Sequence, residues 1–207
     1  MTSSRDARLR GLYAITPQLA DTEALRVKVM RCLAGGAALL QYRAKDIDPA
    51  IALGQARGLA YACREAGALF IVNDSIELAR SCGADGVHLG RDDSSVAQAR
   101  RALPRAIIGA SCYDDPARAR DAAADGADYV AIGSVFASPT KPGARRASLA
   151  HIAEAARISG LPVAAIGGIG LDNAAQVRDA GADMLAVISA VFDAPDIEAA
   201  ARDFALL

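Results

Sequence analysis

Short apolar runs alternate with helix-like segments along nearly the whole chain. Residues 12–15 form the first apolar run, which ends at Thr16-Pro17. Leu25, Val29 and Leu33 then recur at helical spacing, and Gly35-Gly36 follows as a stop signal. The same alternation predicts strands at 12–15, 37–40, 69–72, 86–90, 106–110, 129–132, 163–166 and 184–187, followed by helices at 21–33, 49–66, 75–82, 94–102, 114–126, 148–159, 172–181 and 196–205.

The predicted strands are continuous apolar runs, which is typical of a parallel sheet covered on both faces. A glycine-alanine repeat precedes every second strand, at Gly36, Gly83, Gly126 and Gly181, with intervals of 47, 43 and 55 residues by subtraction. Self-similarity every second strand–helix unit favours a closed barrel. We therefore predict a single (β/α)8 TIM barrel over 11–207, with 1–10 as a flexible polar tail. A doubly wound open sheet is the alternative, but no G-x-G-x-x-G follows the first strand.

Composition and net charge limit the classes of binding partner that we expect. The formal net charge is −1, so no global basic field favours nucleic acid. The four cysteines lack metal-ligand spacing, and a disulfide framework is not expected in a chain of this size. No secretory signal opens the chain, and no run has the roughly 20 apolar residues of a membrane span. We expect a cytoplasmic protein without nucleic-acid or membrane partners; whether it forms a homo-oligomer stays open.

A cationic cluster follows the second predicted strand. Gln41, Arg43 and Lys45 alternate in sequence, so an extended backbone would point them to the same side. Unpaired charges are rarely placed at a core strand end for stability, because their desolvation is costly. The cluster predicts an anion site, and a solvated strand-to-helix turn is the alternative.

Carboxylates follow the next two strands. In a TIM barrel, side chains at the carboxyl ends of the strands meet at the active site. Asp74 and Asp93 would lie there together without histidine or thiolate companions, which suits a hard ion such as Mg²⁺. We expect one Mg²⁺ per subunit, bridging these aspartates to a phosphate. Helix capping is the alternative role for both residues.

A second anion site is predicted on the other side of the barrel. Gly167-Gly168 follows the seventh strand and Ser189 follows the eighth, as in the phosphate site common to this fold. A plain tight turn is the alternative. Lys141, on the long loop 133–147, would reach between the two sites, although 138–143 also reads as an exposed turn.

The remaining candidate residues give weaker evidence for a functional role. His88 reads as a hydrogen-bonded core histidine rather than a base, and His151 as a surface residue of a helix. Cys112 follows Ser111 with no evident base nearby, which argues against a nucleophilic pair. Arg145-Arg146 is too short a basic run to indicate nucleic-acid binding.

With these residues in place, the chain resembles the thiamine-phosphate synthase family over nearly its whole length. Each motif alone is weak, but seven occur in order at predicted strand ends. They are Gln41-x-Arg43-x-Lys45, Asn73-Asp74, His88-Leu89-Gly90-x-x-Asp93, Gly109-Ala110-Ser111, Ser138-Pro139-Thr140-Lys141, Ile166-Gly167-Gly168-Ile169 and Ile188-Ser189-Ala190.

The resemblance implies a transferase that joins hydroxymethylpyrimidine diphosphate to thiazole phosphate and releases pyrophosphate. Arg43, Lys45 and Lys141 would be catalytic, and Asp74 and Asp93 would carry Mg²⁺. The residues implied for the pyrimidine diphosphate are Gln41, Tyr42, Arg43, Ala44, Lys45, Asn73, Ser111 and Lys141. Those implied for the thiazole phosphate are Ser138, Pro139, Thr140, Gly168, Ile188 and Ser189.

Three positions depart from the family pattern. Arg91 stands where Gln is frequent, Ser138 replaces a Thr, and Tyr113 occupies a position that is often His. The roles of Arg91, Tyr113 and Cys112 are left open. A thiazole tautomerase-like paralogue and a non-catalytic thiamine-phosphate-binding protein are the alternative functions; neither would need the complete diphosphate and metal cluster.

Overall fold

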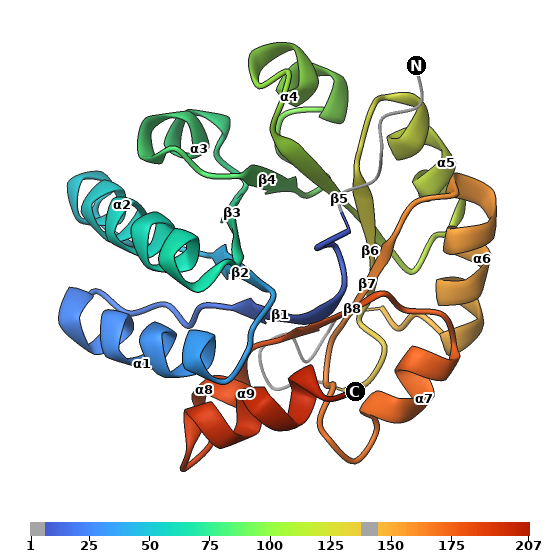
Figure 1. Ribbon diagram of the computed structural model, residues 1–207. Coiled ribbons are helices and arrows are strands. Elements are labelled where there is room, and N and C mark those ends of the chain that lie inside the picture. Colours follow the sequence, from blue (N-terminus) through green and yellow to red (C-terminus); the bar gives the residue numbers. More distant parts are fainter. Residues whose placement is uncertain (1–6, 138–144) are drawn as a thin grey trace.

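Eight parallel strands of the computed structural model close into a barrel, and helices surround it (Figure 1). The structure describes residues 7–137 and 145–207. Each strand pairs with the next along the chain, and β8 pairs with β1 to complete the ring, with Ala14 opposite Val187. The prediction of a (β/α)8 TIM barrel is confirmed, and the open-sheet alternative is excluded by the β1–β8 pairing.

The elements follow in regular alternation. The strands are β1 (Gly11–Ile15), β2 (Leu39–Tyr42), β3 (Leu69–Asn73), β4 (Gly86–Leu89), β5 (Ile107–Tyr113), β6 (Tyr129–Gly133), β7 (Val163–Ile166) and β8 (Met184–Val187). The helices are α1 (Thr22–Ala34), α2 (Pro49–Ala66), α3 (Ile76–Cys82), α4 (Val96–Ala102), α5 (Ala117–Ala124), α6 (Leu149–Ser159), α7 (Ala174–Asp179), α8 (Ser189–Phe192) and α9 (Ile197–Ala205).

Local sequence sets the helix limits. Asp48 caps α2 by accepting hydrogen bonds from two backbone N–H groups, and proline opens its first turn. Ser95 and Gln98 form a capping box at α4. Gly67 and Gly83 end α2 and α3 in the left-handed conformation, which glycine adopts without a Cβ penalty.

The core has two layers, because successive strand residues point to opposite faces. Leu12 and Ala14 of β1 pack outward against the helices, whereas Tyr13 and Ile15 point into the barrel. The interior is therefore a packed layer of side chains, which include Leu39, Leu69, Ile71, Tyr129 and Met184. Packing of this kind fills the barrel interior, so an active-site cavity is expected at the carboxyl ends of the strands.

Three details go beyond the predicted elements. The four-residue helix α8 follows β8 directly, where no helix was predicted. Strand β5 continues to Tyr113 with a register shift between Ser111 and Tyr113. Leu9, within the predicted tail, is only 4% exposed and belongs to the barrel interior, while residues 1–6 lie outside the described part of the chain.

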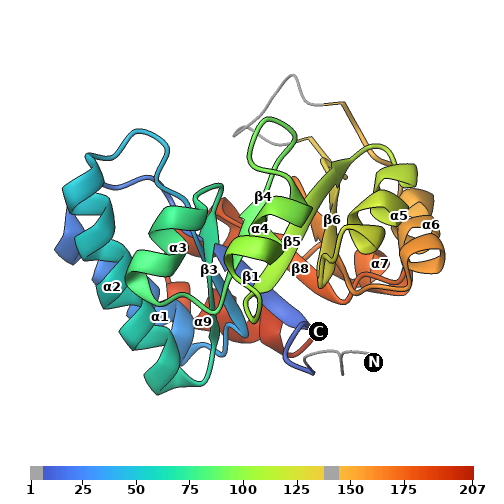
Figure 2. The same ribbon diagram turned by 90° about the horizontal axis from the view of Figure 1, so that it is seen from above.

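The C-terminus lies at the lower edge of the barrel in the side view (Figure 2). Among residues 7–137 and 145–207, every helix is too short or too polar to cross a membrane.

Candidate active site

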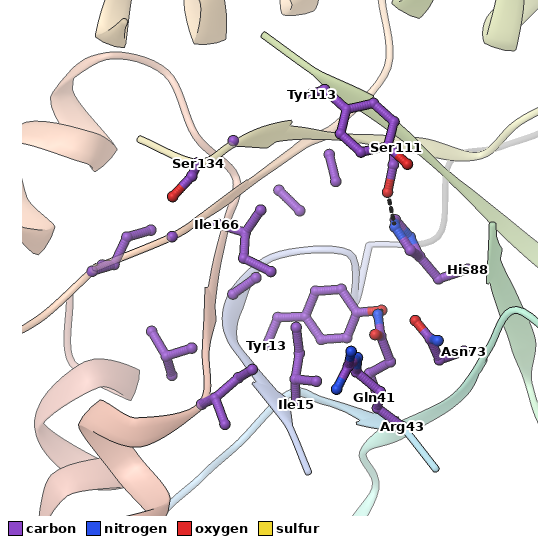
Figure 3. A pocket seen from close by; sticks show the side chains of 18 of the residues that line it. Tyr13, Ile15, Gln41, Arg43, Asn73, His88, Ser111, Tyr113, Ser134 and Ile166 are labelled. Carbon is purple, nitrogen blue, oxygen red and sulfur yellow. Dashed lines mark hydrogen bonds between the residues drawn. The ribbon is translucent and has the colours of Figure 1, made fainter. Parts of the chain in front are cut away.

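One cavity of about 450 Å³ opens at the carboxyl ends of the strands. Its walls come from all eight strands or the segments that follow them, so residues far apart in sequence face each other across it (Figure 3). One part of the lining is apolar and includes Ile15, Ile166, Ala131, Ala164 and Ala186. Another part consists of polar and charged groups. This is the location expected for the active site of a barrel.

Gln41 and Arg43, from the cationic cluster after β2, line this cavity. Lys45, Asp74 and Asp93 lie next to the lining rather than in it. Gln41 is almost fully buried and points inward, and its amide Nε2 donates to the Tyr13 hydroxyl at 2.7 Å. Arg43 is held above it, because its backbone N–H donates to Thr16 Oγ1 at 3.0 Å and its Nη1 donates to Gln18 Oε1 at 2.9 Å. Neither Thr16 nor Gln18 was among the predicted site residues.

Lys45 and Asp74 connect the cationic cluster to the carboxylates, with Lys45 Nζ 3.1 Å from Asp74 Oδ2. Asp74 adopts a positive φ of 66° directly after β3, and its N–H donates to the His88 carbonyl at 2.8 Å. Asp93 accepts a hydrogen bond from Gly90 N–H at 2.7 Å, which fixes it at the turn after β4. The two predicted metal ligands thus lie at neighbouring strand ends.

The electrostatics of this pair favour a bound cation. Burial raises the pKa of Asp93, and the nearby Asp74 carboxylate raises it further, while the Gly90 hydrogen bond and Lys45 act in the opposite direction. Two carboxylates this close destabilise each other's charged form unless a cation lies near them. No group of three or more histidine, cysteine, aspartate or glutamate side chains gathers in the described part of the chain. An all-carboxylate pair fits Mg²⁺, which retains water and takes phosphate oxygens as further ligands.

On the opposite wall, backbone rather than side chains faces the cavity. Gly167 and Gly168 both have positive φ, of 106° and 62°. A Cβ on Gly167 would overlap Ser134, and one on Gly168 would lie 2.8 Å from Phe136 Cβ. Only glycine fits such a close approach of two loops, which leaves the backbone itself facing the cavity. Ile188 and Ser189 complete this neutral wall, where α8 begins.

Two residues of the predicted cluster point elsewhere. Tyr42 is 2% exposed, donates its hydroxyl hydrogen to Gln55 Oε1 at 2.7 Å and stacks on Phe70. Its side chain therefore lies between the barrel and α2, and Ala44 also packs against this outer core. Any contact from these two positions to a ligand would have to come from the backbone.

The other predicted residues divide into two groups. Those that line the cavity are Gln41, Arg43, Asn73, Ser111, Gly168, Ile188 and Ser189. Those that lie outside the described residues are Ser138, Pro139, Thr140 and Lys141.

A buried polar network lies beneath the charged groups. His88 bonds to Tyr129 and Ser111, which confirms the prediction of a hydrogen-bonded core histidine. No base near Ser111 was evident from the sequence, but the pairing of β4 with β5 places His88 Nε2 2.9 Å from Ser111 Oγ. The exclusion of a nucleophilic pair at Cys112 stays a prediction. Burial lowers the pKa of His88 to about 4, so the imidazole is neutral at pH 7. Cys112 is buried, which raises the pKa of its thiol to about 12.

Two positions that depart from the family pattern contact each other at the rim. The Arg91 N–H donates to the Tyr113 hydroxyl at 3.0 Å, and the Arg91 guanidinium carbon lies 4.9 Å from the centre of the Tyr113 ring. Arg145 forms an ion pair with Asp114 on the same side, with Nε and Oδ2 3.0 Å apart. These contacts depend on long-range packing, so sequence patterns gave no signal for them.

Comparison with known proteins agrees with this geometry. A family model described as thiamine monophosphate synthase matches residues 12–191. The thiamine-phosphate synthase of Aromatoleum aromaticum is 57% identical over 98% of both chains, and that of Azoarcus sp. is 56% identical over 91% of this chain and 92% of its own. A solved thiamine phosphate pyrophosphorylase from Pyrococcus furiosus superposes with a TM-score of 0.87, at 36% identity and 96% coverage of each chain. A 3-hexulose-6-phosphate synthase, 20% identical with a TM-score of 0.72 over 94% of this chain and 98% of its own, shares the fold.

Proposed function

The chain belongs to the thiamine monophosphate synthase family, and we propose that its cavity joins hydroxymethylpyrimidine diphosphate to thiazole phosphate. The products are thiamine phosphate and pyrophosphate, so the protein is a transferase. The observation that carries this assignment is the division of one cavity into two walls. Arg43 lines one side of the cavity, with the Lys45–Asp74 ion pair next to it, and Gly167 and Gly168 line a neutral backbone wall. Such a cavity suits two phosphorylated substrates of different charge.

The cationic wall would hold the diphosphate of the pyrimidine substrate. Arg43 and Lys45 supply positive charge where the leaving pyrophosphate gains negative charge, which lowers the barrier to breaking its C–O bond. Gln41, Asn73 and Ser111 line the cavity beside them and would orient the pyrimidine ring. Tyr42 and Ala44 would contribute backbone only, and Lys141 is proposed to act on the same diphosphate from the loop outside the described residues.

Asp74 and Asp93 would hold one Mg²⁺ per subunit. The bound ion would neutralise part of the pyrophosphate charge. Lys45 lies against Asp74, and the two side chains offset each other's charge. The same lysine is then placed to reach a diphosphate bound beside the aspartates.

The neutral wall would hold the thiazole phosphate through Gly168, Ile188 and Ser189, together with Ser138, Pro139 and Thr140. Exposed backbone N–H groups bind phosphate without adding a cation. The thiazole nitrogen would then face the methylene carbon of the pyrimidine and form the new C–N bond once the C–O bond has broken and released pyrophosphate. Positioning of the two partners supplies much of the rate.

This reaction requires no general base, and the interior agrees with that requirement. The electron-rich aminopyrimidine stabilises a positive methylene carbon, and the neutral His88 places no competing positive charge beneath it. The apolar part of the lining, around Ile15 and Ile166, would keep water from capturing that carbon.

The direct test supplies both substrates and Mg²⁺ to the purified chain and follows pyrophosphate and thiamine phosphate. Equal amounts of both products are expected. A well-folded protein that releases neither would contradict the transferase assignment. Conversion of the thiazole alone would favour a tautomerase-like activity, and binding of thiamine phosphate without turnover would favour a binding protein. Cytoplasmic location, the absence of nucleic-acid and membrane partners, and homo-oligomer formation stay predictions.

A further inference from the structure

A continuous chain of four hydrogen bonds crosses the floor of the cavity. It links five side chains on five different strands, from β2 through β1, β6 and β4 to β5. The bonds are Gln41 Nε2 to Tyr13 OH (2.7 Å), Tyr13 OH to Tyr129 OH (2.7 Å), Tyr129 OH to His88 Nδ1 (2.9 Å) and His88 Nε2 to Ser111 Oγ (2.9 Å). Its two ends, Gln41 and Ser111, line the cavity (Figure 3).

The chain has a direction, because each linking group has one proton to donate. The Gln41 amide donates to the Tyr13 hydroxyl. Either hydroxyl could donate in the Tyr13–Tyr129 bond, but the Tyr13 proton has no other acceptor among the described residues, which assigns the donor role to Tyr13. Tyr129 accepts that proton and must direct its own to His88 Nδ1. A neutral imidazole that accepts at Nδ1 carries its proton on Nε2, and therefore donates to Ser111 Oγ.

The groups that transmit this direction are buried and neutral. Tyr13 is 1% exposed and Tyr129 is fully buried, and burial raises the pKa of both hydroxyls above their ordinary value. Both ring nitrogens of His88 bond to hydroxyl groups rather than to a carboxylate, as a neutral imidazole does, and the residue is only 8% exposed. Water therefore has little access to reverse an individual bond, and the direction at one end is coupled to the direction at the other.

We propose that Tyr13, Tyr129 and His88 are positioning residues that fix the hydrogen-bonding polarity of Gln41 and Ser111 toward the substrate. With Nε2 bound to Tyr13, the Gln41 amide oxygen is an acceptor, and no other described side chain occupies it. With its oxygen accepting from His88, the Ser111 hydroxyl is a donor, and His88 is its one described partner. The cavity thus presents an acceptor from β2 and a donor from β5.

This pattern matches an aminopyrimidine, which offers an amine as donor and ring nitrogens as acceptors. The ligand assignment rests on the proposed function, whereas the polarity of the chain does not. A neutral donor at Ser111 also leaves the ring nitrogen unprotonated, so the pyrimidine keeps the electron density that stabilises its methylene cation. Reversed polarity would place a donor opposite the amine and an acceptor opposite the ring nitrogen, and both mismatches would weaken binding.

The imidazole tautomer of His88 gives a direct readout in the ligand-free protein. The chain has only two histidines, His88 and His151, so ¹⁵N-histidine NMR at pH 7.5 should show two imidazoles. His151→Gln assigns the spectrum and keeps the helix start, because Gln can replace His151 in the capping box with Ser148. We expect His88 in the Nε2–H form. An Nδ1–H form, or an exchanging mixture of the two, would overturn the proposal.

Two single-atom deletions test the transmission. Tyr129→Phe breaks the chain beside His88, so the fixed tautomer should be lost. Tyr13→Phe removes the group that orients the Tyr129 hydroxyl, so His88 should become an exchanging mixture of tautomers although the Tyr129–His88 contact remains. Tyr61→Phe is the control, because Tyr61 is 63% exposed and lies on the outer helix α2. A wild-type His88 spectrum in either buried variant would contradict the proposal.

Steady-state kinetics then test whether the polarity of the hydrogen-bond chain affects binding of the pyrimidine diphosphate. Loss of one oriented hydrogen bond is expected to raise the KM for the pyrimidine diphosphate roughly 5- to 10-fold in both buried variants. The KM for the thiazole phosphate should stay within twofold, which a general loosening of the barrel would not produce. Equal increases for both substrates would show a merely structural role. If the wild type has the expected tautomer but no activity, the proposed function fails while the polarity stands.

Discussion

Lys45 Nζ lies 3.1 Å from Asp74 Oδ2, so a cation of the proposed diphosphate site pairs with a carboxylate of the proposed metal site. Half of the Lys45 side chain is exposed, and a pair of this kind contributes little to stability. The ion pair instead positions both side chains, so that Lys45 can bind an anionic ligand and Asp74 a cationic one. Binding of Mg²⁺ and diphosphate would exchange this internal pair for two external ones.

The Mg²⁺ concentration that turnover requires should therefore depend on the two aspartates. Asp93→Asn keeps an oxygen for the Gly90 N–H but loses the charge, so we expect roughly tenfold more Mg²⁺ for half-maximal turnover, or a larger shift. Asp92→Asn is the matched control, since Asp92 is exposed, lines the cavity and directly precedes Asp93. Unchanged Mg²⁺ dependence in Asp93→Asn would contradict the metal assignment. The assay is a Mg²⁺ titration of pyrophosphate release.

A methyl group on Gly168 should impair the thiazole phosphate site selectively. The substitution Gly168→Ala places a Cβ against Phe136 at a φ of 62°, and we expect a loss of about 1–2 kcal/mol in the free energy of unfolding. The KM for the thiazole phosphate should rise at least about tenfold, with a smaller change for the pyrimidine diphosphate. Steady-state kinetics with each substrate varied in turn give the answer. Equal effects on both would place the phosphate elsewhere.

Gly54→Ala is its stability control. Gly54 lies in the exposed middle of α2, and its added Cβ would meet no atom within 4 Å. Alanine has the higher helix propensity, so the free energy of unfolding should increase by about 0.5–1 kcal/mol with unchanged kinetics. Urea denaturation measures both variants, and a loss of stability in Gly54→Ala would show an unrecognised contact at this face.

Tyr42→Phe separates stability from binding. The change leaves Gln55 Oε1 without its buried donor, so the free energy of unfolding should fall by about 1–3 kcal/mol. The KM for the pyrimidine diphosphate should stay the same, because the Tyr42 side chain points to α2. Denaturation and kinetics on one preparation suffice. A raised KM at full stability would show that the phenol reaches the ligand.

Acid should destabilise the protein through His88. Burial lowers its pKa from 6.5 to about 4, so between these values the unfolded state binds more protons than the folded state. The stability associated with the neutral imidazole is thus complete above pH 6.5 and is lost as the pH falls toward 4. Between pH 7 and pH 5 the expected loss is about 2 kcal/mol.

His88→Gln isolates this contribution, because the amide does not titrate. The variant should be less stable than the wild type at pH 7, yet lose about 2 kcal/mol less between pH 7 and pH 5. Urea denaturation at the two pH values measures both slopes, and carboxylates common to both proteins cancel. Parallel slopes would show that His88 is already protonated in the folded state.

The sequence was sufficient for the architecture because the signals were local. Continuous apolar runs and glycine stops such as Gly67 and Gly83 indicate where strands and helices lie without tertiary information. Closure of the barrel then brought the predicted cationic cluster and carboxylates together, because parallel strands share one carboxyl end. The four-residue helix α8 was missed, since it is too short to show a period.

Side-chain direction and partnership could not be derived in the same way. Gln41 and Tyr42 are neighbours in one motif, yet one points into the barrel and the other toward α2. Tyr13 and Tyr129 read as ordinary strand residues, and only the register of distant strands brings their hydroxyls to 2.7 Å. The contact between Arg91 and Tyr113 likewise depends on the irregular end of β5.

Asp74 and Tyr113 are the two non-glycine residues with positive φ in the described part of the chain, at 66° and 57°. Tyr113 lines the cavity, and Asp74 directly follows Asn73, which lines it. A glycine at position 74 would relieve the backbone by about 1 kcal/mol, while the half-exposed pair with Lys45 contributes little to stability. Screens for variants with a higher melting temperature should therefore select Asp74→Gly and recover stable proteins that lack a proposed metal ligand. Stability and activity are opposed at this position, and engineering for thermal stability should leave Asp74 in place.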